Sequence, residues 1–264
     1  MVTTTASTSP ELKFLNFSLR CDKSDPQISF ETPWNWECAY GKRIAVISNN
    51  SFLRYQLVAC MSGLVSPVSG EILGNSVIGW PVGGEGGLDK KLRISHAVNF
   101  LTTVYGDCLE QSRVSLNQFW DLLSSVEINH DLTIKELTKE QKDFFCLALS
   151  VLFSFDCYLI TKSSSYTLMS SAAKPLRALF RKQIEGKAII ATSTSGRFRR
   201  EFCTEGLVLG SFGQILFAGE LAAAVEWADQ NLKSSEASDS DDDQFEMGLD
   251  LRNVDSYDGS DDDF

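Results

Sequence analysis

The sequence predicts an α/β domain with a mostly parallel central sheet, antiparallel hairpins near both ends, and a helical subdomain. Short apolar runs of strand length alternate along the chain with longer helical stretches. Glycine-containing turns at 69–72 and 210–213 indicate the hairpins. Helical patterns between about residues 90 and 155 indicate the helical subdomain.

Each strand is predicted from a short apolar run that ends at a polar or glycine-rich turn. Trp34 and Trp36 lie two apart, so they share one face of the second strand. We interpret this tryptophan pair as core, with ligand stacking as the alternative. The predicted strands are Leu12–Leu19, Ile28–Trp36, Ile44–Ile47, Ser76–Val82, Cys157–Ile160, Ala188–Thr192, Leu207–Leu209 and Gln214–Phe217.

Helices are predicted where the apolar residues follow a helical spacing. The helix after the strand Ile44–Ile47 is expected to end at Gly63 and Pro67. The most apolar run, Phe144–Ile160, is interrupted by Asp156 and is short for a membrane span, so we interpret it as a buried helix followed by a buried strand. The predicted helices are Gln56–Leu64, 94–105, 115–127, Glu136–Phe155, one within Ser163–Lys182, Gly196–Cys203 and Glu220–Leu232.

Charge is distributed unevenly between the predicted domain and its ends. Residues 234–264 carry 12 acidic residues and one basic residue, whereas residues 1–233 hold 23 of each sign. The net charge of −11 therefore belongs to an acidic tail and does not describe the domain surface. We predict a disordered N-terminus at 1–10, a domain at 11–233 with its helical subdomain at about 90–155, and a disordered tail at 234–264.

The cysteine and histidine content argues against disulfides and zinc. Seven cysteines, an odd number without a C-x-x-C pair, are typical of reduced thiols in a cytosolic protein. With only His96 and His130, we expect no metal site. The first residues lack the basic start and apolar segment of a signal peptide, so we expect a cytoplasmic protein, at the inner face of the cell membrane if its partner is there.

The segment Ile44–Met61 has the layout of a phosphate-binding loop but lacks its chemistry. A buried strand, a small polar loop and a helix follow one another there. A phosphate loop needs the pattern G-x-x-x-x-G-K-[ST]. In that frame Ser48 and Leu53 stand at the glycines, Arg54 at the lysine and Tyr55 at the Ser/Thr position.

Three stretches resemble the ATP-binding-cassette (ABC) ATPases, in particular the branch that exports capsular and O-antigen polysaccharides. Residues 45–72 align without a gap on that family's phosphate loop, helix and P-x-S-G-x-I hairpin. Residues 80–87 resemble its W-P-V-G-x-x-G-G stretch, and residues 155–160 resemble the F-D-x-Y-L-I of its Walker B strand. The resemblance covers roughly residues 10–232 and implies a P-loop NTPase-like ABC ATPase fold.

The resemblance also implies where the family's functional residues stand, and this chain departs from the pattern at each of them. Ser51 is a further glycine position, and Asp89 aligns with the Q-loop glutamine. The nucleotide-site positions are Ser48, Ser51, Leu53, Arg54, Tyr55, Asp89, Thr161 (Walker B Asp), Lys162 (catalytic Glu) and Thr194 (switch His), and the signature positions are Thr138, Lys139 and Glu140.

These departures predict a pseudo-ATPase, and hence that the chain is not an enzyme. Phosphoryl transfer depends on positioning and charge stabilisation by the groups that are replaced here. No cofactor is expected, apart from weak ATP binding through Arg54. The five residues from Gly83 to Gly87 could form a phosphate cradle, but no Lys-Ser/Thr pair follows, and we favour a β-to-helix connection.

Two functions follow from the resemblance. The first is a regulatory or scaffolding protein in capsule polysaccharide export or synthesis, catalytically inactive, whose protein partner is an export permease or an active ABC ATPase. The second is a nucleotide-binding subunit of a heteromeric exporter that still binds ATP. We expect a peripheral association with the membrane through the partner, and no nucleic-acid partner.

The acidic tail and a basic surface are candidate interaction sites. Five apolar residues of the tail are spaced among acidic and small residues as in a docking segment that adds a strand to a partner: Phe245, Met247, Leu249, Leu251 and Phe264. A solubilising tail is the alternative. Arg177, Arg181, Lys182, Arg197, Arg199 and Arg200 form a basic surface, either solvated or suited to an acidic partner or the chain's own tail.

Overall fold

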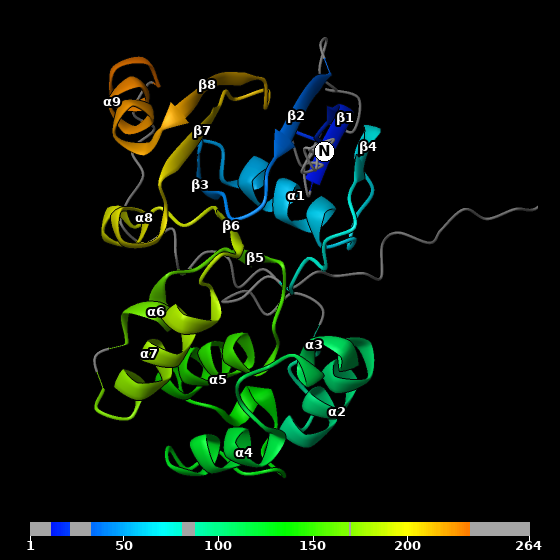
Figure 1. The fold of residues 1–264 in the computed structure, drawn as a ribbon, viewed down its shortest axis with the longest axis vertical. Coiled ribbons are helices and arrows are strands. Elements are labelled where there is room, and N and C mark those ends of the chain that lie inside the picture. The colour runs from blue at the N-terminus through cyan, green and yellow to red at the C-terminus, as the bar shows by residue number, and fades with distance from the viewer. Residues whose placement is uncertain (1–11, 22–32, 81–87, 169, 233–264) are drawn as a thin grey trace, which may run out of the picture.

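Two β-sheets organise the fold (Figure 1). The structure, a computed structural model, describes residues 12–21, 33–80, 88–168 and 170–232. The larger sheet has the strand order β5-β6-β3-β7-β8, with four parallel strands and β8 antiparallel at one edge. Its strands are β5 Cys157–Ile160, β6 Ala188–Ala191, β3 Arg43–Ile47, β7 Glu205–Leu209 and β8 Ile215–Glu220. The mostly parallel sheet predicted from the sequence is therefore confirmed.

The smaller sheet is antiparallel and packs beside the first helix. Its order is β2-β1-β4, with β1 Leu12–Ser18 between β2 Trp34–Cys38 and β4 Ser69–Leu73. Phe14 of β1 contacts both Trp34 and Trp36, with ring centroids 5.4 and 5.3 Å apart. This supports the interpretation of the tryptophan pair as core.

The helices divide between two regions (Figure 1). Helices α2 to α5 gather on one side of the molecule, away from the small sheet, and we call this group the helical subdomain. Helices α6 and α7 lie beside α5, α1 lies between the strands of the two sheets, and α9 packs against β7 and β8 at the edge of the large sheet. The bounds are α1 Ser51–Met61, α2 Ile94–Val104, α3 Gly106–Glu110, α4 Leu116–Ser124, η1 Ile134–Glu136, α5 Lys139–Leu152, α6 Ser164–Thr167, α7 Ala173–Gln183, α8 Gly196–Phe202 and α9 Leu221–Asn231. None of the described helices is long and apolar enough to cross a membrane.

Several predicted boundaries and one predicted strand were wrong. Helix α1 begins five residues earlier than expected, because Asn50 caps it by accepting a hydrogen bond from the Leu53 amide at 3.0 Å. Helix α5 is shorter than predicted, because Thr138 and Gln141 form a capping box that fixes its start. Within the described part of the predicted strand Ser76–Val82, Ile78 makes only an isolated bridge to Cys157.

The first hairpin also pairs differently from the prediction. β4 lies alongside β1 instead of the segment that follows it. Gly70 has a φ of +77°, and a Cβ there would overlap the backbone oxygens of Leu15 and Asn16. The glycine therefore permits the close approach of β4 to an irregular point of β1. The hairpin of β7 and β8 is confirmed. The glycine cluster 83–87 and the tail lie outside the described residues.

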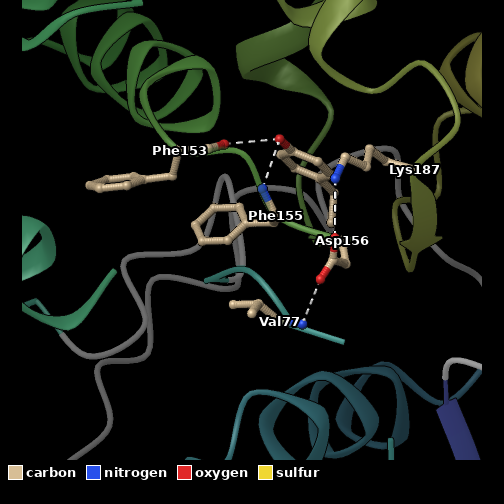
Figure 2. Close-up of polar contacts among 6 residues, drawn as sticks. Val77, Phe153, Phe155, Asp156 and Lys187 are labelled. Atoms are coloured by element: carbon tan, nitrogen blue, oxygen red, sulfur yellow. Dashed lines mark hydrogen bonds and ion pairs between the residues drawn. The ribbon is translucent and has the colours of Figure 1, made fainter. Parts of the chain in front are cut away.

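A polar junction joins the end of α5 to the large sheet (Figure 2). The buried Tyr158 hydroxyl donates to the Phe153 carbonyl at 2.9 Å and accepts from the Phe155 amide at 3.3 Å. Asp156 accepts a hydrogen bond from the Val77 amide at 3.0 Å and pairs with Lys187 at 3.1 Å. These contacts hold the start of β5 against the end of α5. They thereby also position the loop that follows β5 after Ile160.

Candidate functional site

The carboxyl ends of β5, β6 and β3 meet at one edge of the large sheet. Ile160 and Ala191 are opposite each other, and Ala45 is opposite Ala191 on the other side. The Thr192 amide donates to the Ile160 carbonyl at 2.9 Å, so the adjacent loops stay together beyond the last ladder pair. Ligands of open parallel sheets bind at such an edge. We call this region the carboxyl edge.

Three of the predicted site segments converge on the carboxyl edge. Residues 48–55 follow β3, Thr161 and Lys162 follow β5, and Thr194 lies in the loop after β6. Thr161 and Lys162 are half-buried, while Thr194 is exposed beside the buried Ser193. The structure thus brings together three segments that the family resemblance had singled out separately.

Asn50 fixes the turn between β3 and α1. Its amide N–H donates to the Ser48 hydroxyl at 3.2 Å, and its side-chain oxygen caps α1. Its side-chain nitrogen donates to the carbonyls of Cys21 at 3.0 Å and Ser211 at 3.1 Å. A three-residue turn thus connects strand to helix and is tied both to the segment that follows β1 and to the β7–β8 turn. This role of Asn50 was not predicted, although an Asn before a helix is a recognised cap signal.

Arg54 is buried at the carboxyl edge, with 7% of its surface exposed. Its guanidinium donates to the Ser48 carbonyl, across the turn that joins β3 to α1. Leu53, at the neighbouring glycine position, is a fully buried core residue of α1. Burial also raises the pKa of the Tyr55 phenol, which therefore stays protonated. Ser51 is exposed at the first position of the helix.

Arg199 brings a second guanidinium to the same edge. Its Nε donates to the Ser193 carbonyl at 2.8 Å, in the loop that follows β6. Burial, and next the charge of Arg54, lower its pKa. The sequence placed Arg199 on an exposed basic surface, and this was wrong, because the buried Phe198 and Phe202 orient α8 so that Arg199 turns toward the loop.

The other predicted positions lie in the helical subdomain. Asp89 is exposed and accepts a hydrogen bond from the Lys91 amide at 2.9 Å. Thr138 caps α5, and the first two residues of this helix, Lys139 and Glu140, are exposed. The five tail residues Phe245, Met247, Leu249, Leu251 and Phe264 lie outside the described residues.

The side chains at the carboxyl edge fit an anion and do not fit a divalent cation. Arg54, Arg199 and Lys162 carry positive charge there, and guanidinium groups bind phosphate oxygens in a planar fork. Mg²⁺ prefers carboxylate oxygens, and the pair after β5 offers a hydroxyl and an ammonium instead. In the part of the chain that the structure describes, no three His, Cys, Asp or Glu residues cluster as metal ligands.

Comparison with solved structures identifies the fold as that of an ABC ATPase domain. An inward-facing putative metal-chelate-type ABC transporter matches 81% of this chain and 85% of its own with a TM-score of 0.56 at 12% identity. An ATP-binding subunit of an ABC transporter matches 83% of this chain and 92% of its own with a TM-score of 0.57 at 15% identity. At these identities the likeness concerns the fold.

The similar sequences are ATP-binding proteins, named for polysialic acid transport or capsule polysaccharide export in two of the three cases below, which agrees with the predicted resemblance. The polysialic acid transport ATP-binding protein KpsT of Escherichia coli is 29% identical over 70% of this chain and 83% of its own. The capsule polysaccharide export ATP-binding protein CtrD of Neisseria meningitidis serogroup B is 25% identical over 64% and 76% of the respective chains. The ATP-binding protein BexA of Haemophilus influenzae is 26% identical over 66% and 78%. No model of a known protein family matches the sequence.

These relatives correct one prediction. The sequence led us to expect a protein that is not an enzyme, and its relatives contradict this, because ATP-binding subunits of ABC transporters are ATPases. The replaced side chains at the carboxyl edge are facts of the sequence, but they do not establish inactivity.

Proposed function

We propose that the chain is the ATP-binding subunit of a capsule-type polysaccharide exporter. It would work at the cytoplasmic face of the membrane, held there by a permease partner. The observation that carries this proposal is the carboxyl edge, where the loops after β3, β5 and β6 meet in an ABC ATPase fold. The named activities of KpsT and CtrD support the substrate class.

Arg54 is the residue that we propose as the main cation for the nucleotide phosphates. It occupies the first turn of α1, where the helix dipole also favours negative charge. On binding, its guanidinium would exchange the Ser48 carbonyl for phosphate oxygens, a stronger acceptor for a charged donor. Arg199 would add a second positive charge from the loop after β6.

Titration calorimetry of the full chain with ATP tests this proposal. We expect binding by the wild type and a loss of at least about tenfold in affinity for Arg54→Ala, which corresponds to about 1.4 kcal/mol. Arg54→Lys should retain part of the affinity, because it keeps the charge but not the planar fork. Arg113→Ala, which removes an exposed arginine before α4, is the control and should bind as the wild type does.

Absence of binding by a folded wild-type chain would overturn the proposal, as would equal affinity for the wild type and Arg54→Ala. Circular dichroism establishes that each variant is folded. Phosphate release should be measured on the chain co-purified with its permease, since the proposed unit of activity is the assembled exporter.

A heteromeric exporter, in which this chain pairs with a different ATP-binding subunit, is the second candidate. Thr161 and Lys162 favour it, because they stand after β5 where ABC ATPases carry two catalytic carboxylates. In a heteromer, the different subunit would supply such carboxylates in its own nucleotide site. Capture of the tagged chain from its native cell distinguishes the two. A second, different ATP-binding chain beside the permease supports the heteromer, and this chain and the permease alone support the homomer. A regulatory or scaffolding role in the same export system stays a prediction.

A further inference from the structure

Helices α7 and α8 present a basic face that the proposed nucleotide site does not use. The two helices lie side by side, because Arg181 of α7 forms an ion pair with Glu201 of α8 and the rings of Phe180 and Phe202 are 6.0 Å apart. Together the helices contain seven basic residues and one acidic residue. We define the basic face by its exposed cations, which are Lys174, Arg181, Lys182, Arg197 and Arg200.

Helical spacing gathers these charges on one side of each helix. Lys174 and Arg181 are seven residues apart in α7, which returns them to the same helix face, and Arg197 and Arg200 are three apart in α8. Residues 1–233 as a whole hold equal numbers of basic and acidic residues, so the excess on α7 and α8 is a local concentration of charge.

The described part of the chain ends near α8, one of the two helices of this face. Asp229, in the last turn of α9, lies close enough to Arg199 of α8 for its charge to raise the pKa of that guanidinium. Helix α9 ends at Asn231, two residues after Asp229. The segment 234–264 is therefore joined to the described structure close to α8.

The segment 234–264 has the charge and the length to occupy that face. It carries 12 acidic residues and one basic residue, with blocks of acidic residues at 239–243 and 261–263. A flexible chain of that length spans on the order of 30 Å, about twice the length of an 11-residue helix such as α7. A short tether also gives the segment an effective concentration of about 1 mM at its own domain, which sustains even weak binding.

We propose that the acidic segment 234–264 binds the basic face of α7 and α8 of its own chain. The contact is electrostatic, with carboxylates of the 239–243 block against the ammonium and guanidinium groups of the face. A partner protein with a basic surface, or a second copy of this chain, would compete with the basic face for the same segment. The proposal is independent of nucleotide binding at the carboxyl edge.

Zero-length carbodiimide cross-linking of the full chain, read by mass spectrometry, tests the proposal. This reagent joins a carboxylate to an amine only where the two are in contact, and Lys174 and Lys182 provide amines on the basic face. We expect cross-links from 239–243 to these two lysines, with a yield that does not depend on protein concentration. The yield should fall severalfold between about 0.05 M and 0.5 M salt, as screening predicts.

Charge reversal supplies the matched comparison. Arg197→Glu/Arg200→Glu should lower the cross-link yield severalfold, while Lys91→Glu/Lys135→Glu, at exposed lysines of the helical subdomain, should leave it unchanged. Cross-links that are equally frequent at Lys91 and Lys135 in the wild type would overturn the proposal, as would no cross-link to Lys174 or Lys182. A yield that rises with protein concentration would assign the contact to a second copy and overturn the intrachain form.

Discussion

Lys187 Nζ lies 3.1 Å from Asp156 Oδ1, in an ion pair between the residues that precede β6 and β5 (Figure 2). The side chains are 17% and 33% exposed, so the pair is more protected than most surface pairs. The other carboxylate oxygen of Asp156 accepts from the Val77 amide at 3.0 Å, and its carbonyl accepts from the Ala188 amide at 2.9 Å. One residue thereby holds two parallel strands and the segment before residue 81 in place.

Replacing this carboxylate should destabilise the domain. In Asp156→Ala, the Lys187 ammonium and the Val77 amide lose their acceptor in a partly buried place, which should cost about 1–3 kcal/mol of unfolding free energy. Equilibrium unfolding in urea measures the change. The exposed pair Lys13–Glu37, 2.7 Å apart with side chains 44% and 51% exposed, is the control. Glu37→Ala should cost less than about 1 kcal/mol, and equal losses for the two variants would contradict our interpretation of the junction.

The turn between β3 and α1 should depend on Asn50. Asn50→Ala removes the cap of α1 and leaves the carbonyls of Cys21 and Ser211 without this donor, so we expect a loss of about 1–3 kcal/mol in unfolding free energy. Asn50→Asp keeps the cap oxygen but not the two donated hydrogen bonds, and should fall between the wild type and the alanine variant.

Thermal unfolding of the wild type, Asn50→Asp and Asn50→Ala measures the order of their stabilities. Thr138→Ala, which removes the exposed side-chain cap of α5, is the comparison and should cost about 1 kcal/mol. An Asn50→Ala variant as stable as the wild type would contradict the role assigned to this residue.

Local patterns were sufficient for the strands of the large sheet. β3, β5, β6 and the β7–β8 hairpin are continuous apolar runs bounded by polar or glycine turns, and each was located within a few residues. Positions 48–55, 161–162 and 194 were named from the family resemblance, and the parallel order of β5, β6 and β3 is what brings them to one edge. The pairing of β4 with β1 could not be predicted, because it joins residues more than 50 apart and depends on Gly70 passing close to an irregular strand.

The orientation of individual side chains also could not be predicted from the sequence. Arg199 lies in a basic stretch that indicates an exposed helix, and only the packing of Phe198 and Phe202 turns it toward Ser193. Comparison with the family's motifs predicted the fold and the kind of relative. It did not predict activity, because a motif comparison does not evaluate the charge arrangement that the Arg54 and Arg199 guanidinium groups offer.

Stability should fall at alkaline pH because of buried thiols. Burial raises the pKa of Cys60 and Cys203 to about 12, compared with about 9 for an accessible thiol. Above pH 9 the unfolded chain releases these protons while the folded chain retains them, so the folded state loses up to about 1.4 kcal/mol per pH unit for each thiol until the pH reaches the folded pKa. Below pH 9 both states are protonated and the thiols cause no change.

Urea unfolding under reducing conditions at pH 8, 9, 10 and 11 measures this dependence. Cys60→Ala should show a shallower decline than the wild type above pH 9, even though it starts from a lower stability because it leaves a small cavity. Constant or rising stability between pH 9 and 11 would contradict the burial of these thiols.

Contact between β7 and α9 leaves no room for a side chain at Gly206. A Cβ there would overlap the Cβ of the fully buried Ala224, so Gly206→Ala should force the helix away from the sheet and cost about 1–3 kcal/mol of unfolding free energy. Gly106→Ala is the matched change in open space, at the start of α3, where the added Cβ meets no heavy atom within 4 Å apart from its chain neighbours and the backbone of its own helix. It should be neutral or stabilising by up to about 1 kcal/mol, because alanine has less conformational freedom in the unfolded chain. Urea midpoints of the two variants that shift by the same amount in the same direction would show that the β7–α9 contact is looser than the structure has it.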